Sequence, residues 1–290
     1  MGTDSFSLSR RGVMPILSSL KRFDTANLRL RVISAAIMAP LALLAVYLGG
    51  IAYGAAVTIA VTLGLYEWLR LIAPTARAQI IGIACAMLVV VITGGWLFSA
   101  SFGGMLGVVA TLALFLIAVR DHDERAGWIA LGIPYMGGSG LALLALRATP
   151  DIGGALIFFL LVTVWSTDIG AFIAGRLIGG PKLAPSISPS KTWAGLLGGI
   201  ALAVILGYFS ADLLGAKRPV IALALAPVLA CVGQLGDLFE SYFKRRSGVK
   251  ESGDLIPGHG GVLDRIDGLV FASVFLFLFQ AAIGEPINWW

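Results

Sequence analysis

The last third of the chain carries acidic residues at spacings that place them on common helix faces. Offsets of three, four and seven residues bring side chains onto one side of a helix, and four polar residues meet this condition: Asp237, Glu240, Ser241 and Lys244. Asp264 and Asp267 are likewise three residues apart. Carboxylates with only His259 nearby favour a hard cation, and Mg²⁺ is usually held by one or two carboxylates together with substrate phosphates. The pattern predicts a magnesium-dependent site for phosphate chemistry, with a purely structural lattice of ion pairs as the alternative.

Basic residues accompany these carboxylates: Lys244, Arg245, Lys250 and Arg265. Their charges would neutralise a bound polyphosphate. Glycines beside His259 would let backbone N–H groups approach an anion closely. Zinc is not favoured, because the chain has only two histidines and two cysteines and lacks CxxC and HExxH motifs.

A polar loop at 176–192 has features of an anion receptor. Ser188 followed by Pro189 predicts a helix start, with serine as the N-cap and proline at the first helical position. The first turn of that helix would present Ser190, Lys191 and Thr192. Free backbone N–H groups, hydroxyls and an ammonium group together suit a phosphate. A structured re-entry turn with a snorkelling lysine is the alternative interpretation.

Asp168 lies within an otherwise apolar segment. An ionised carboxylate in such surroundings needs a cation or hydrogen-bond donors. Gly170 and Ala174, four residues apart, form a small-residue face that permits close helix packing. We interpret Asp168 as part of the wall of a polar cavity, and an ion pair that only locks two helices together is the alternative.

Membrane-spanning helices must position these residues. The chain of 290 residues is 58% hydrophobic and 13% charged, whereas soluble domains are roughly 45–50% apolar and about 25% charged. Its mean hydropathy is +0.92. A soluble globular domain and a disordered chain are therefore excluded. Stretches without Asp, Glu, Lys or Arg run over 32–66, 78–119, 126–146, 152–167, 192–211, 219–236 and 268–284.

The lengths of these stretches predict the number of crossings. A helix needs roughly 20 apolar residues to cross a bilayer, so the first two stretches are each too long for one crossing. Gly49–Gly50 and residues 99–104 provide natural breaks. The crossing that starts at 152 must extend past Asp168 to reach full length. The predicted fold class is an all-α polytopic integral membrane protein with about nine transmembrane helices.

Basic residues predict the orientation, because cytoplasmic loops are enriched in Lys and Arg. A cytoplasmic N-terminus leaves all but three of the 21 basic residues on the cytoplasmic side, the exceptions being Arg147, Lys217 and Arg218. The net charge of +5 then reflects topology and attraction to anionic membrane lipids, and no nucleic-acid partner is expected.

The polar residues divide the predicted chain into three regions. A basic cytoplasmic N-terminal arm (1–31) precedes about five transmembrane helices (32–150), which carry few polar groups. A catalytic transmembrane region (151–290) follows, with cytoplasmic loops at 176–192 and 237–267.

Two motifs resemble those of a known family. Residues 241–245 (SYFKR), Lys250 and residues 257–267 (PGHGGVLDRID) are similar to the signature of the phosphatidate cytidylyltransferases, also called CDP-diacylglycerol synthases. Residues 181–192 (PKLAPSISPSKT) are similar to a second, upstream segment of that family. The specific resemblance covers residues 165–268.

The chain departs from the family pattern at three positions. Glu251 stands where aspartate is usual, Ala194 where glutamate is common, and Ile169 where threonine is more usual. Because Glu251 is longer than aspartate, it is not assigned a metal-binding role. The alanine at 194 suggests that this position is not essential for the chemistry.

The resemblance implies transfer of CMP from CTP to phosphatidic acid, which gives CDP-diacylglycerol and pyrophosphate for phospholipid biosynthesis. The lipid phosphate would attack the CTP α-phosphate in line with the help of Mg²⁺, at the cytoplasmic face of the inner membrane. The implied metal ligands are Asp237 and Asp264, with Asp267 and Asp168 as weaker candidates. The catalytic residues would be Asp237, Asp264, Lys244 and Arg265. Substrate contacts are assigned to Ser188, Ser190, Lys191, Thr192, Arg245, Lys250, His259 and Asp168, where His259 either donates to a phosphate or braces the glycine turn.

Two other functions remain alternatives. A CTP-dependent transferase could act on an isoprenoid-linked lipid, and an ion-coupled transporter could use the same carboxylates. Transporters often have broken helices in both halves, whereas the polar residues here are concentrated in the C-terminal half. The sequence leaves open whether a second, monovalent cation accompanies Mg²⁺ and whether the protein is a homodimer.

Overall fold

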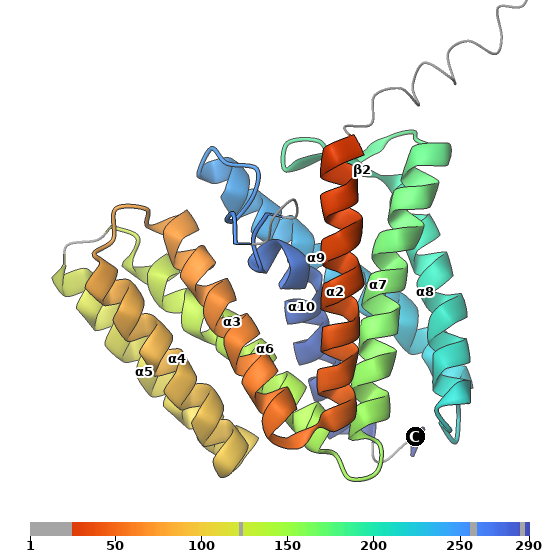
Figure 1. The fold of residues 1–290 in the computed structure, drawn as a ribbon, viewed down its shortest axis with the longest axis horizontal. Coiled ribbons are helices and arrows are strands. Elements are labelled where there is room, and N and C mark those ends of the chain that lie inside the picture. The colour runs from red at the N-terminus through yellow and green to blue at the C-terminus, as the bar shows by residue number, and fades with distance from the viewer. Residues whose placement is uncertain (1–24, 122–123, 256–259, 285–287) are drawn as a thin grey trace, which may run out of the picture.

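The computed structural model describes residues 25–121, 124–255, 260–284 and 288–290, with residues 25–35 as backbone only. The described chain is almost entirely helical (Figure 1). Its long helices are α2 (Thr25–Leu48), α3 (Gly50–Ile72), α4 (Ala78–Leu97), α5 (Ala100–Arg120), α6 (Ala126–Ala148), α7 (Gly153–Leu177), α8 (Trp193–Leu213), α9 (Val220–Arg246) and α10 (Leu263–Phe279). A hairpin of β1 (Lys182–Ala184) and β2 (Ser188–Thr192) separates α7 from α8, and a π-helical turn, η2 (Gln280–Gly284), extends α10.

The predicted polytopic helical fold is confirmed. Of the nine long helices in the described chain, eight are long and apolar enough to cross a membrane, and α2 adds a shorter apolar stretch, Ala36–Leu48. Gly49 and Gly50 separate α2 from α3 with φ angles of 62° and 49°, which glycine adopts at little cost. Ser99 separates α4 from α5, and its hydroxyl caps α5 by accepting the N–H of Phe102 at 3.1 Å.

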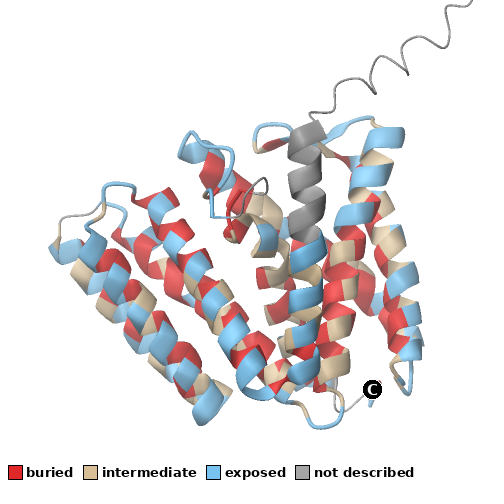
Figure 2. Cartoon of the chain, in the orientation of Figure 1, coloured by how far each residue is buried: buried red, intermediate tan, exposed pale blue. Residues whose placement is uncertain are grey.

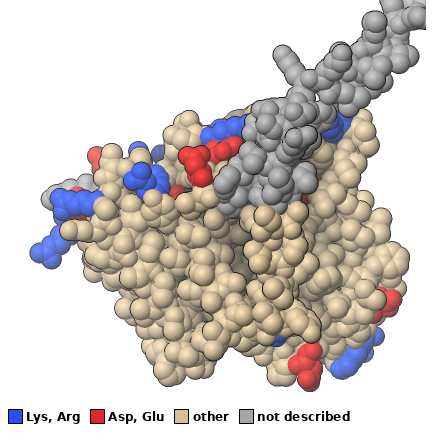
Figure 3. Space-filling model, in the orientation of Figure 1, with Lys and Arg blue, Asp and Glu red and all other residues tan. Residues whose placement is uncertain are grey.

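Charged side chains gather at the two ends of the bundle on the face seen in Figure 3, with an uncharged band between them. In a bilayer this uncharged band contacts the hydrocarbon core. Helices can lie there because they satisfy their own backbone polar groups. Arg147 donates from Nε to the Val46 carbonyl at 3.0 Å and so ties the end of α6 to the end of α2. The direction in which the bundle crosses the membrane stays a prediction.

The helices differ in how far the rest of the bundle covers them. In α6, 72% of the most apolar segment is buried, whereas in α5 only 22% is. Figures 1 and 2 show α4 and α5 at one side of the bundle with much of their surface outward, while α6 passes through its interior. Coverage alone does not mark the helices of the polar site, because α8 and α10 are only 33% and 28% buried over the same kind of segment.

An aromatic cluster fixes the rotation of α9. The Trp68 ring of α3 lies 5.0 Å from Tyr135 of α6, 5.9 Å from Phe239 and 4.9 Å from Phe243 between ring centroids. Trp68 also donates from Nε1 to the Trp128 carbonyl at 3.0 Å. Aromatic pairs at these separations stabilise beyond their buried area. Because Phe239 and Phe243 alternate with the polar residues of α9, this packing decides where the polar face points.

Small residues let α7 and α8 approach closely. A Cβ on Gly170 would lie 2.5 Å from the carbonyl oxygen of Gly198, and a Cβ on Gly199 would lie 2.7 Å from that of Thr167. These distances leave no room for a side chain, so glycine is required for the observed approach. The close packing holds Asp168 in a fixed position next to α8.

The helix predicted to begin at Ser188–Pro189 is absent, and that prediction was wrong. These residues belong to β2, which pairs antiparallel with β1. Helix α8 begins only at Trp193, with Thr192 as the N-cap that accepts the N–H of Gly195 at 3.0 Å. The φ angle of proline suits an extended segment as well as a first helical turn, and pairing with β1 decides between them.

Two predicted region boundaries can be compared with the structure. Helix α2 begins at Thr25, within the predicted arm, and residues 1–24 lie outside the described chain. Helix α9 continues to Arg246, so the first part of the predicted loop 237–267 is helical. The carboxylates of this segment are therefore presented by a rigid element.

Candidate active site

A cavity of about 380 Å³ brings the three polar clusters of the sequence together. Helix α7 contributes Asp168, the hairpin contributes Lys191, and α9 contributes Asp237. The full lining is Asp168, Ala171, Phe172, Gly175, Arg176, Ser190, Lys191, Thr192, Gly195, Leu196, Gln234 and Asp237. Five of the predicted site residues therefore share one cavity, as expected for a polar site at the end of the bundle.

The main ion pair of this cavity joins the hairpin to α9. Lys191 Nζ lies 2.5 Å from Asp237 Oδ2, with 16% and 29% of the two side chains exposed. The other oxygen of Asp237 accepts the Ser241 hydroxyl at 3.1 Å. Asp237 is therefore partly open to water and to a molecule that enters the cavity, whereas the ammonium nitrogen of Lys191 is itself buried beside it.

A second, more buried network surrounds Lys244. Its ammonium group donates to Glu240 at 2.8 Å and to Asp264 at 2.7 Å. The side chains are 10% exposed for Lys244, 0% for Glu240 and 7% for Asp264. The second oxygen of Asp264 accepts backbone N–H groups from Ser252 at 2.9 Å and Gly261 at 2.8 Å. Asp264 is thus fully hydrogen-bonded by protein groups.

Asp267 connects the two groups electrostatically. Its charged neighbours include Asp237, Glu240 and Asp168. Several carboxylates gathered in one partly buried region repel one another unless a cation lies among them. Glu240 adds to this demand, because its Oε1 is buried and has no hydrogen-bond partner.

These carboxylates fit a magnesium ion that is completed by substrate. Within the described residues, no three Asp, Glu, His or Cys side chains are grouped closely enough to bind a metal ion by themselves. Asp168 and Asp237, however, both line the cavity. Mg²⁺ commonly takes one or two carboxylates and fills its other positions with phosphate oxygens and water. Asp264 is absent from the cavity lining described above, so of the two main predicted ligands only Asp237 faces this space.

The remaining predicted residues lie in different settings. Arg245 donates to the carbonyls of Ile187 and Val249 at 3.2 Å each and so ties the hairpin to the end of α9. Ser188 is buried within the hairpin. Lys250 and Arg265 are exposed, and Arg265 lies among the charged neighbours of Asp168. His259 lies outside the described residues.

Several residues at these sites had no predicted role. Gln234 and Arg176 line the cavity, and Arg176 lies 5.9 Å from the centroid of the Phe172 ring. Glu67 of α3 is buried against the segment that contains Asp264. Gln234 lies one helical turn before Asp237, which is a signal that could have identified it. Glu67 offers no such signal, because its partners are more than 180 residues away in the sequence.

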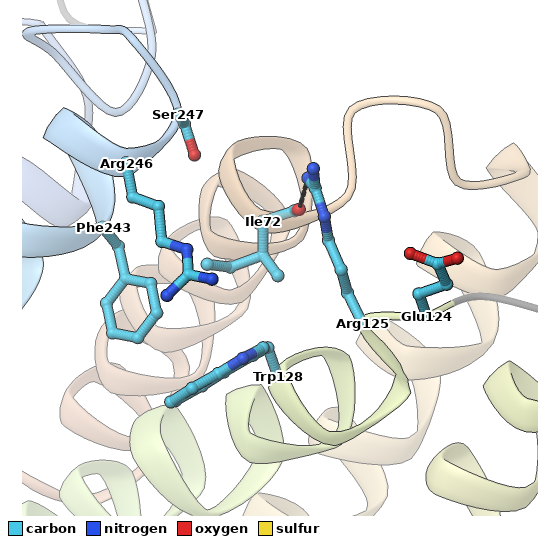
Figure 4. A pocket seen from close by; sticks show the side chains of 7 residues that line it. All are labelled: Ile72, Glu124, Arg125, Trp128, Phe243, Arg246 and Ser247. Atoms are coloured by element: carbon cyan, nitrogen blue, oxygen red, sulfur yellow. Dashed lines mark hydrogen bonds between the residues drawn. The ribbon is translucent and has the colours of Figure 1, made fainter.

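A separate cavity of about 350 Å³ lies between the ends of α3, α6 and α9 and contains none of the predicted site residues (Figure 4). The guanidinium group of Arg246 extends over Phe243 and Trp128, while Arg125 donates to the carbonyl of Ile72. The acidic Glu124 at its edge offsets part of the positive charge. The cavity that joins the three sequence clusters therefore remains the candidate active site.

Comparison with known proteins shows similarity along nearly the whole chain. A protein-family model described as "Cytidylyltransferase family" matches residues 29–283. The phosphatidate cytidylyltransferase of Brucella suis is 42% identical over 267 residues, which cover 90% of this chain and 96% of the relative. That of Pseudomonas aeruginosa is 35% identical over 266 residues, covering 88% and 98%. That of Bacillus subtilis is 38% identical over 176 residues, covering 60% and 65%. The similarity thus includes the N-terminal helices as well as the motifs of the candidate site.

Proposed function

The chain belongs to the cytidylyltransferase family, and from this premise we propose that it transfers CMP from CTP to phosphatidic acid, giving CDP-diacylglycerol and pyrophosphate. The observation that carries the proposal is the 42% identity to a phosphatidate cytidylyltransferase over 90% of the chain. The cavity that joins Asp168, Lys191 and Asp237 supports it with groups suited to phosphates.

The reaction needs little covalent help from the protein. An oxygen of the lipid phosphate, ionised at neutral pH, attacks the α-phosphorus of CTP. The bond between the α-phosphorus and the bridging oxygen breaks, and pyrophosphate leaves with the electron pair. Catalysis then consists of aligning two anions and neutralising their charge.

The residues of the cavity divide these tasks. Lys191 and the hydroxyls of Ser190 and Thr192 would contact phosphate oxygens from the hairpin side. Asp237 and Asp168 would hold Mg²⁺, which when bound supplies positive charge to the phosphates of CTP. The ammonium group of Lys191, now 2.5 Å from Asp237 Oδ2, would then be available to the substrate. Asp267 stays a weaker candidate ligand, and a monovalent cation stays an alternative companion of Mg²⁺.

The membrane determines how the two substrates meet. The polar residues lie at the end of apolar helices, so the acyl chains of phosphatidic acid would remain in the bilayer while its phosphate reaches the cavity. CTP would arrive from the water phase. We place the protein in the inner membrane with this site facing the cytoplasm, because that orientation leaves only three basic residues on the far side. A homodimer remains a prediction.

Incubation of the purified protein with Mg²⁺, α-phosphate-labelled CTP and phosphatidic acid tests the proposal. We expect labelled CDP-diacylglycerol and unlabelled pyrophosphate, and loss of both after chelation of the metal. A parallel reaction with a polyprenyl phosphate distinguishes the main alternative. Label transferred only to the isoprenoid lipid would contradict the proposed acceptor, and no consumption of CTP with either lipid would contradict the transferase function.

A further inference from the structure

Glu67 is a buried carboxylate of the N-terminal half that contacts residues within and beside the C-terminal signature motif. Its side chain lies near the end of α3, and the residue is 1% exposed. It accepts the N–H groups of Val262 at 3.0 Å and Leu263 at 2.7 Å, and the hydroxyl of Ser252 at 3.1 Å. A buried carboxylate needs such donors, and all of those found here belong to a segment at least 185 residues away.

These contacts provide α10 with the cap that its own sequence lacks. The residue at the N-cap position is Val262, whose side chain cannot accept a hydrogen bond. Helix N-termini leave backbone N–H groups unpaired and attract negative charge. Glu67 supplies both an acceptor and a negative charge from another helix. The start of α10 is therefore defined by a residue of α3.

The same segment holds Asp264. Ser252 donates its hydroxyl to Glu67 and its backbone N–H to Asp264, and Gly261 also donates its N–H to Asp264. Glycine leaves room for these contacts, since a Cβ on Gly253 would lie 2.8 Å from Glu67 Oε1 and a Cβ on Gly261 would overlap the Glu67 and Ser252 side chains, which would have to shift. Glu67 and Asp264 thus both hydrogen-bond to Ser252, and they also bind the described residues 261–263 at the start of α10.

We propose that Glu67 is a positioning residue for the CMP-transfer site, which acts by fixing the start of α10 and thereby the carboxylate of Asp264. The inference rests on the proposed function, because it treats Asp264 and the Lys244 network as part of the catalytic arrangement. Through this contact the N-terminal helices take part in forming the site. The glycine at 261 in the signature motif is then explained partly by the space that Glu67 occupies.

The test is Glu67→Gln, which keeps the volume but replaces one acceptor oxygen with an amide donor that faces N–H groups. We expect kcat to fall about 10- to 100-fold, as for small displacements of catalytic groups, while the KM for phosphatidic acid changes less than about twofold. Amide hydrogen exchange of peptides that contain Val262 and Leu263 should become faster. Asp121→Asn, in an exposed ion pair with Arg77, is the matched control and should change neither quantity.

The outcomes separate this inference from the proposed function. Wild-type kcat or wild-type exchange at Val262 and Leu263 in Glu67→Gln would overturn it. If wild-type protein transfers no CMP, the proposed function fails, while the exchange measurement still reports whether Glu67 holds this segment. If Glu67→Gln does not fold, Ser252→Ala replaces it, because that variant removes one hydrogen bond to Glu67. Its kcat should fall about three- to tenfold, and an unchanged kcat would overturn the inference.

Discussion

The two lysine–carboxylate groups near the candidate site differ in how far water reaches them. The Lys191–Asp237 pair has side chains that are 16% and 29% exposed. Around Lys244, the carboxylates of Glu240 and Asp264 are 0% and 7% exposed. Separating a partly exposed pair costs less than separating a buried one, because water or substrate can take over part of the charge. Separating a buried pair leaves a charge without compensation, which costs several kcal/mol.

This difference indicates distinct tasks for two groups of the same chemistry. The less buried Lys191–Asp237 pair lies in the cavity, where a phosphate can replace Asp237 beside Lys191. The buried network joins α9 to α10 through two hydrogen bonds of Lys244 that form without substrate. We therefore expect the first group to affect substrate handling and the second to affect both folding and catalysis.

Removal of the central cation of the buried network should have the largest effect. Lys244→Ala leaves Glu240 and Asp264 buried without a counter-charge, so unfolding free energy should fall by about 3–5 kcal/mol. Thermal unfolding in detergent measures this change. Lys191→Ala is the matched control, and an equal or smaller loss in Lys244→Ala would remove the distinction between the two groups.

Neutralising one carboxylate in each group should separate catalysis from folding. Asp237→Asn and Asp264→Asn should each lower kcat by about 100- to 1,000-fold, because charge stabilisation of the reacting phosphates is lost or displaced. Only Asp264→Asn should also lower the unfolding temperature, since the new amide would face N–H donors in a buried position. Measurements of kcat and of unfolding temperature on both variants test these expectations. Wild-type turnover by Asp237→Asn would show that Asp237 is not part of the active site.

Loss of Lys191, the lysine that lines the cavity, should act mainly on substrate binding. Lys191→Ala removes one charge-assisted contact to phosphate, so the KM for CTP should rise about tenfold with little change in unfolding temperature. Steady-state kinetics at varied CTP and fixed phosphatidic acid measure the change. Unchanged kinetics for both substrates would show that Lys191 contacts neither.

An ion pair away from both groups should have the smallest effect. Arg77 and Asp121 are paired at 2.7 Å, with 71% of the arginine side chain exposed. Arg77→Ala should lower unfolding free energy by less than about 1 kcal/mol and leave kcat unchanged. A larger loss of unfolding free energy would show that the exposed fraction of an ion pair does not determine how much the pair stabilises the fold.

Much of the fold could be predicted because the bilayer restricts which backbone structures can cross it. Runs without charge had to become helices, and Gly49–Gly50 and Ser99 divided the two longest runs where the structure divides them. The start of α8 could not be predicted, because Ser188–Pro189 suits both a helix start and a strand. Pairing with β1 decides that choice through contacts between separate segments.

The candidate site was predictable in its members but not in its arrangement. Spacing alone placed Asp237 and Lys244 on a polar helix face. It gave no reason to expect that Lys191 pairs with Asp237 while Asp264 pairs with Lys244. Those partners depend on how α9 is rotated by the aromatic cluster.

The amino-acid sequence by itself determined the helical membrane fold, the breaks between its longest helices and the identity of most polar residues at the site. These follow from local composition and periodicity, which act over a few residues. Only the tertiary structure decided that Asp237 faces the cavity and that Asp264 is buried against Lys244. It also decided that Glu67 caps α10. Such choices depend on contacts between side chains that are from 20 to more than 180 residues apart in the sequence, and patterns over a few residues do not report contacts at those separations.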